Sequence, residues 1–100
     1  PWMVTPDEIG DPHDLNLKTL VNGEVRQDGN TRDLIFDCYD QVAELSTVFT
    51  LEPGDILSTG TPQGVGALME PPQFMADGDV VRVEIDKIGY IENKVVREPI

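Results

Sequence analysis

This 100-residue sequence has few positive charges. Seven lysines and arginines stand against 19 aspartates and glutamates, which gives a formal net charge of −12. The shortage of cations argues against nucleic-acid binding, because Lys and Arg neutralise a phosphate backbone. It also argues against docking on anionic membranes. The acidity itself favours solubility and is also typical of salt-adapted hosts.

The sequence also lacks paired cysteines, long apolar runs and a leader-like start. Cys38 is the single cysteine, so no intrachain disulfide can form and nothing indicates an oxidising compartment. No apolar run approaches the length of a transmembrane helix, and no charged start precedes an apolar stretch. We therefore predict a cytoplasmic protein without a membrane partner. A length of 100 residues allows one domain at most.

What is present begins with a predicted β-hairpin over residues 14–28. Leu15 and Leu17 alternate with polar neighbours, as the residues of a half-buried strand do. Asn22-Gly23 then supplies the positive φ angles that a type I′ turn requires. Val25 resumes the strand after the turn.

A helix is predicted within residues 34–49, where apolar residues recur at helical spacing. Asp37 or Asp40 can cap its start, and Glu52-Pro53-Gly54 lies beyond its end. Downstream, the residue pattern predicts a short strand at 55–58, a long irregular loop at 62–78, and strands at 79–86 and 90–96. The sum is mostly β with one helix, an α+β class.

Several segments resemble the fumarylacetoacetate hydrolase family. The strongest is LEPGDILSTGTPQGVG at residues 51–66. The others are PWMVTPDEI (1–9), VNGEVRQ (21–27), NTRDLIF (30–36), GDVVRVEI (78–85) and IGYIENKV (88–95). They follow one another in order over nearly the whole chain. The resemblance implies that residues 1–100 are the C-terminal segment of a single catalytic domain with a mixed β-roll or barrel-like fold.

The resemblance also implies a function. Family members are cytoplasmic homodimers that bind Mg²⁺ or Mn²⁺ and act on small oxo-acids from aromatic-compound and amino-acid catabolism. The implied reaction is hydrolytic C–C cleavage of an acylpyruvate, in which the metal stabilises the departing enolate. Isomerisation or decarboxylation within the same family is the alternative. A noncatalytic β-rich interaction domain is a further alternative from a different class.

Thr59, Gly60 and Thr61 are the candidate substrate-binding residues. In the family, the Gly-Thr of this motif lies against the bound substrate. The chemistry agrees, since glycine permits close backbone approach and fixed hydroxyl and amide donors stabilise a developing negative charge. The structural alternative is that Thr-Gly-Thr-Pro is only a strand end followed by a turn.

The family's metal ligands and catalytic residues match no position in this sequence, because they lie upstream of the resembling region. We therefore expect no catalytic or metal-ligating residue here, and we expect that the rest of the domain is absent from this chain. Asp7, Glu8 and Asp11 are interpreted as residues of turns, as are Asp77 and Asp79. His13 is interpreted as a surface or capping histidine.

Overall fold

A tight hairpin forms the first half of the sheet. In the computed structural model, which describes residues 2–99, β1 (Asn16–Val21) and β2 (Glu24–Asn30) pair antiparallel. Asn22 has a φ of 52° and Gly23 a φ of 79°, which are the positive angles of a type I′ turn. The predicted hairpin is confirmed, and β2 runs two residues past the predicted end.

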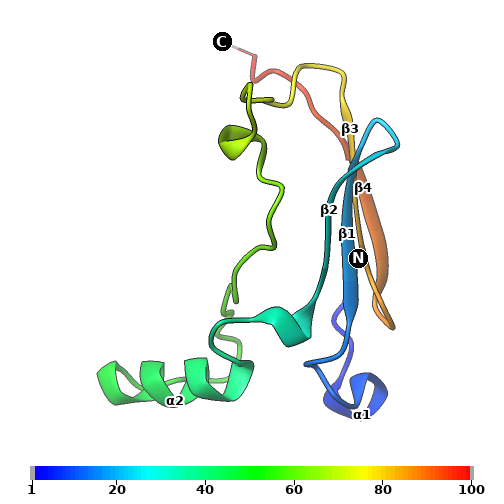
Figure 1. Cartoon of the computed structure of the whole chain (residues 1–100). Helices are drawn as coiled ribbons and strands as arrows, with labels where there is room; N and C mark the ends of the chain where they lie inside the picture. The colour runs from blue at the N-terminus through cyan, green and yellow to red at the C-terminus, as the bar shows by residue number, and fades with distance from the viewer. Residues whose placement is uncertain (1, 100) are drawn as a thin grey trace.

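The second half of the sheet comes from the C-terminal strands. β3 (Val80–Ile85) and β4 (Gly89–Lys94) pair antiparallel. β3 also pairs with β1, so the strand order is β2-β1-β3-β4 (Figure 1). The predicted fold class is confirmed as α+β with one four-stranded antiparallel sheet.

The sheet has an apolar face and a charged face. Leu17 lies opposite Ile85, and Val21 lies opposite Val81, so their side chains share one face. Lys18 lies between Asp28 and Glu84 on the two neighbouring strands, and these three side chains share the other face. The side-chain period of two therefore puts most of the apolar and most of the charged residues on opposite faces.

The predicted helix is α2 (Cys38–Val48). The Asp37 side chain accepts a hydrogen bond from the Asp40 backbone N–H at 2.8 Å, so Asp37 is the N-cap. The structure adds shorter helical turns that the pattern did not predict. They are α1 (Pro6–Ile9), η1 (Thr31–Asp33) and η2 (Gly66–Leu68).

The predicted strand at residues 55–58 is wrong, because no strand is present there. The Asp55 N–H bonds to the Glu52 carbonyl at 3.1 Å, and the Glu52 N–H bonds to the Asp55 carboxylate at 2.9 Å. These bonds close a turn around Pro53-Gly54. The segment beyond it stays extended but forms no ladder with a neighbouring strand among the described residues, and a strand needs that ladder.

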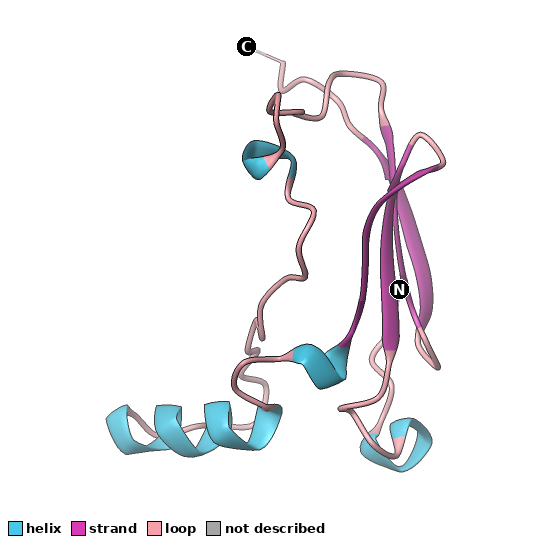
Figure 2. Cartoon of the chain, viewed as in Figure 1, coloured by secondary structure: helices cyan, strands magenta, loops and turns pink. Residues whose placement is uncertain are grey.

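Few apolar side chains are covered by these residues. Only Ile9 and Leu15 are buried apolar residues among those described. Helix α2 projects away from the sheet (Figure 2), and its Tyr39 and Val48 side chains are exposed. None of the described helices is long and apolar enough to cross a membrane. Many large apolar side chains of this segment therefore remain exposed when the segment stands alone.

Candidate functional site

The predicted substrate-binding residues form an exposed bend after α2. Gly60 has a φ of +124°, a conformation that disfavours any residue with a Cβ. A Cβ added to Gly60 would meet no atom within 4 Å, so the space beside it is open. Thr59, Gly60 and Thr61 are all exposed. A ligand can therefore approach the backbone at this bend.

Thr61 is held to the sheet by one side chain. The Gln27 amide nitrogen on β2 donates to the Thr61 hydroxyl oxygen at 2.8 Å and to the Pro62 carbonyl at 2.8 Å. The donors come from the strand and the acceptors from the bend, so these bonds fix the start of the following loop.

The loop that follows comes very close to β2 at Gly64 and to itself at Gly66. A Cβ added to Gly64 would lie 2.0 Å from the Arg26 carbonyl oxygen, and one added to Gly66 would lie 1.9 Å from the Gln73 carbonyl oxygen. The Arg26 guanidinium also donates to the Gln73 side-chain oxygen and lies 3.5 Å from the Met69 sulfur. Only glycine fits at the two points of closest approach.

A cavity of about 680 Å³ lies between the apolar face of the sheet and this loop. Thr61 lines it, whereas Thr59 and Gly60 do not. The other lining residues come from the sheet and from two stretches of the loop. They are Thr19, Val21, Asn22, Arg26, Gln27, Asp79 and Val81, with Gly64–Ala67 and Gln73–Met75. The structure thus brings the predicted Thr61 hydroxyl to the rim of a real cavity.

Asp79 lines the same cavity and ties the two halves of the sheet together. Its carboxylate accepts from the Ala76 N–H at 2.7 Å and from the Asn22 side-chain amide at 2.8 Å. The Ala76 and then the Asn22 hydrogen bond hold the pKa of Asp79 below the ordinary value of an aspartate. The prediction that Asp79 serves a turn is confirmed.

We expect Asp79→Asn to remove a pH-dependent contribution to stability. A folded-state pKa below the unfolded one gives stabilisation that is complete above the unfolded pKa of about 3.9 and is lost as the pH falls through the folded pKa. The unfolding free energies of wild type and variant should therefore differ above about pH 5 and converge as the pH falls through the folded pKa of Asp79. Urea titrations across this range, with the exposed Asp7→Asn as the charge-matched control, measure the difference. A gap of the same size at every pH would contradict the assignment.

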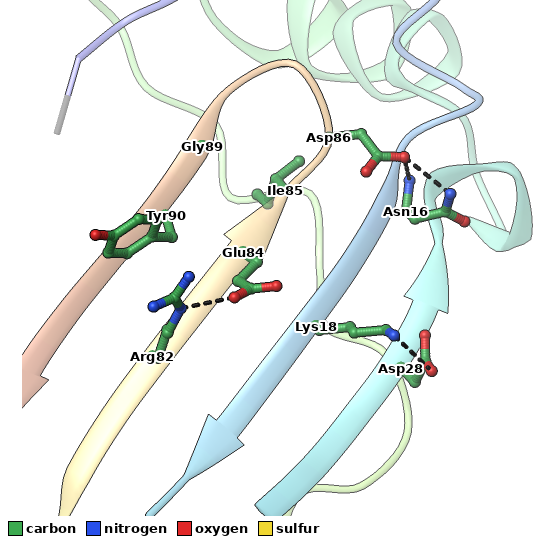
Figure 3. Close-up of a pocket in the computed structure, with 9 residues that line it drawn as sticks. All are labelled: Asn16, Lys18, Asp28, Arg82, Glu84, Ile85, Asp86, Gly89 and Tyr90. Atoms are coloured by element: carbon green, nitrogen blue, oxygen red, sulfur yellow. Dashed lines mark hydrogen bonds and ion pairs between the residues drawn. The ribbon is translucent and has the colours of Figure 1, made fainter. Parts of the chain in front are cut away.

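A second cavity, of about 560 Å³, lies on the charged face of the sheet. Figure 3 shows its charged lining side chains paired with one another or with Asn16. Lys18 lies 3.6 Å from Asp28, and Arg82 lies 2.6 Å from Glu84 and 3.7 Å from the centre of the Tyr90 ring. The charges of Lys18 and Arg82 are thus neutralised by partners within the sheet.

His13 is confirmed as a capping residue. Its Nε2 accepts a hydrogen bond from the Cys38 N–H at 3.0 Å, at the first turn of α2. Its ring meets the Tyr39 ring edge-on at 5.2 Å. His13 therefore connects the start of β1 to the start of α2.

No group of three or more His, Cys, Asp or Glu side chains within residues 2–99 could hold a metal ion. Among the acidic residues of the entry segment, Asp11 serves a turn as predicted, whereas Asp7 and Glu8 belong to a short helix instead of a turn. Asp7 and Glu8 lie in the first turn of α1. The Asp11 carboxylate accepts from the His13 N–H at 2.8 Å. The described residues thus do not fit a resident divalent cation, and we assign no chemical step to a metal held by them.

Sequence reasoning missed Arg26 and Gln27 as parts of the site. Both belong to the segment VNGEVRQ, which reads as a hairpin strand. In a regular strand their side chains would point to opposite faces. Nothing in the pattern shows that both contact the loop.

Comparison with known proteins gives a family match over almost the whole chain. The family model described as "Fumarylacetoacetate (FAA) hydrolase C-terminal" matches residues 1–96. An uncharacterised protein of Staphylococcus saprophyticus is 50% identical over 93 residues, which are 93% of this chain and 31% of that protein. The chain thus spans about a third of the length of this relative.

Solved structures of two enzymes are also similar to this chain over most of its length. The crystal structure of maleylpyruvate hydrolase from Sphingobium sp. SYK-6, in complex with manganese(II) and pyruvate, is 45% identical with a TM-score of 0.85, covering 95% of this chain and 33% of that one. The 5-carboxymethyl-2-hydroxymuconate delta-isomerase of Mycobacterium smegmatis is 45% identical with a TM-score of 0.77, covering 89% of this chain and 33% of that one.

Proposed function

This chain belongs to the fumarylacetoacetate hydrolase family, and from that membership we propose that it is the C-terminal third of a divalent-metal-dependent enzyme. The proposed reaction is hydrolytic C–C cleavage of a 2-oxo or 2,4-dioxo acid of the acylpyruvate type. The similarity to maleylpyruvate hydrolase supports this choice. We further propose a cytoplasmic homodimer that works in aromatic-compound catabolism.

The observation that carries the proposal is the Thr61 hydroxyl at an open bend on the rim of a cavity. This hydroxyl accepts a hydrogen bond from Gln27, so its own proton is free to be donated elsewhere. We propose that it donates to a carboxylate or enolate oxygen of the substrate. Gly60 leaves room for the substrate to reach the adjacent backbone, and Thr59 extends the contact surface.

The proposed cation is Mg²⁺ or Mn²⁺, held by the part of the domain that precedes these residues. The manganese complex of maleylpyruvate hydrolase supports a divalent metal. When bound, such a cation acts as a Lewis acid toward carbonyl oxygens. The role proposed for this chain is confined to its own donors at the bend.

Isomerisation is the second candidate reaction, with decarboxylation beside it. The similarity to 5-carboxymethyl-2-hydroxymuconate delta-isomerase favours it, because the identity over this segment is as high as for the hydrolase. A bend that stabilises an enolate oxygen serves all three reactions, since each develops negative charge on an oxo-acid oxygen. The residues of this segment do not separate them.

The test uses the full-length protein, meaning these residues together with the remainder of a family-length chain. Acylpyruvate is supplied with Mg²⁺ or Mn²⁺, and pyruvate release, carbon dioxide release and double-bond migration are followed separately. We expect metal-dependent pyruvate release. Carbon dioxide or a migrated double bond without pyruvate would assign the second candidate. No turnover of acylpyruvate with either metal would overturn the proposed enzyme.

A further inference from the structure

A β-bulge aims two adjacent side chains of β2 at the same loop. Thr19 lies opposite Gln27, but the next residue, Leu20, lies opposite Val25, so Arg26 is the extra residue of the bulge. Successive side chains of a regular strand point to opposite faces, and a bulge re-aims them. Arg26 and Gln27 both line the cavity beside the loop. Gln27 bonds its start, and Arg26 bonds its later part.

The orientation of the Gln27 amide follows from its partners. The Pro62 carbonyl oxygen can only accept a hydrogen bond, so the Gln27 atom 2.8 Å from it must be the nitrogen. The same nitrogen lies 2.8 Å from the Thr61 hydroxyl oxygen. An amide nitrogen has two N–H groups and no acceptor capacity. Gln27 therefore donates both bonds.

This arrangement restricts the directions in which the Thr61 hydroxyl can donate its proton. Because its oxygen accepts from Gln27, its proton points away from the amide. A hydroxyl that accepts a hydrogen bond is also a stronger donor, since linked hydrogen bonds polarise one another. No other hydrogen bond of the Thr61 hydroxyl is found among the described residues. The donor is thus oriented before any ligand arrives.

We propose that Gln27 is a positioning residue that commits the Thr61 hydroxyl to donating a hydrogen bond to an anionic substrate oxygen. This inference rests on the proposed function of Thr61. Gln27 acts through Thr61 and does not itself touch the substrate. Its chemical role is to donate to the Thr61 hydroxyl oxygen, so that this hydroxyl can itself only donate elsewhere. A side chain that only held the loop in place would not have this effect.

The discriminating substitutions are Gln27→Glu and Gln27→Met in the full-length protein. Both remove the amide donors at similar side-chain length. Glutamate, however, presents an acceptor in the same place, so the Thr61 hydroxyl would donate to residue 27 instead of to the substrate. Methionine presents no strong acceptor and leaves the hydroxyl free to rotate. A purely structural role would instead tie the loss of kcat in each variant to its loss of folding stability, which thermal unfolding of both variants measures.

We expect kcat to fall about 100-fold in Gln27→Glu and about tenfold in Gln27→Met, with the loss in kcat and kcat/KM alike. The double variant Gln27→Glu/Thr61→Val should be no slower than Thr61→Val alone, because both changes remove the same donor. Gln41→Glu is the matched control. Gln41 donates to the Phe36 carbonyl at 2.8 Å on α2, so the same atom exchange there should leave kcat unchanged.

The outcomes distinguish the positioning role of Gln27 from the substrate contact of Thr61. Equal losses in the Glu and Met variants, or losses that multiply with that of Thr61→Val, would overturn the positioning role while Thr61 keeps its own. An unaffected Thr61→Val enzyme would overturn the proposed function of the bend itself. If Gln27→Glu fails to fold, the double-mutant cycle of Gln27→Met and Thr61→Val decides by itself. Losses in kcat that multiply in the double variant would then overturn the positioning role.

Discussion

Gly64→Ala is expected to destabilise the protein by at least about 3 kcal/mol, which is at the upper end of single-substitution effects. The added Cβ would lie 2.0 Å from the Arg26 carbonyl oxygen and 3.2 Å from Gln27 Cγ. The first contact is with backbone, which no side-chain rotation relieves. Gly64 also has a φ of +103°, where a residue with a Cβ is strained. The loop would have to leave β2, and the hydrogen bonds from Gln27 to Thr61 and to the Pro62 carbonyl would stretch with it.

Gly54→Ala is the control that isolates the clash from the strain. Gly54 has nearly the same φ, +100°, but a Cβ there would meet no atom within 4 Å. We expect this variant to lose about 1–2 kcal/mol from backbone strain alone. Urea unfolding of both full-length variants gives the two free energies. Equal losses would show that the loop does not press against β2 as described.

Local chemistry made most of the fold predictable. Asn22-Gly23 determines the hairpin, since few other residue pairs adopt two successive positive φ angles. Asp37 marks the start of α2 because its carboxylate accepts a free backbone N–H there. The strand predicted at residues 55–58 failed for a non-local reason. β-Branched and apolar residues permit an extended backbone, but only a neighbouring strand turns it into a ladder.

Only part of the candidate site could be predicted from the sequence, for a related reason. Thr61 stood out because it belongs to a motif with a chemical rationale, and the structure brings it to the rim of a cavity. Gln27 did not stand out, because its contact depends on a one-residue slip in the pairing of β1 and β2. A bulge comes from the pairing of two strands and leaves no signature in either strand by itself. Residue alternation therefore gives no sign that Gln27 and Arg26 contact the same loop.

Thr61→Val in the full-length protein is expected to lower kcat about 100-fold, the typical cost of removing one donor from an oxyanion site. Valine replaces the hydroxyl with a methyl group at nearly constant volume. The side chain is exposed, so the cost to stability comes mainly from the lost bond to Gln27, about 1 kcal/mol. An interaction that strengthens in the transition state lowers kcat and kcat/KM together, whereas uniform substrate binding would raise KM alone.

Thr50→Val provides the control for Thr61→Val, because Thr50 is exposed and lies outside the cavity that Thr61 lines. It changes the same atoms away from the bend and should leave kcat as it is. Steady-state kinetics of both variants, with their thermal unfolding measured in parallel, then separate chemistry from folding. A Thr61→Val enzyme with wild-type kcat and KM would remove this hydroxyl from the site. A loss confined to KM would mean that Thr61 binds the ground state of the oxo-acid and does not select its enolate. That result would leave stabilisation of the developing charge to other donors of this segment, such as the backbone N–H groups beside Gly60.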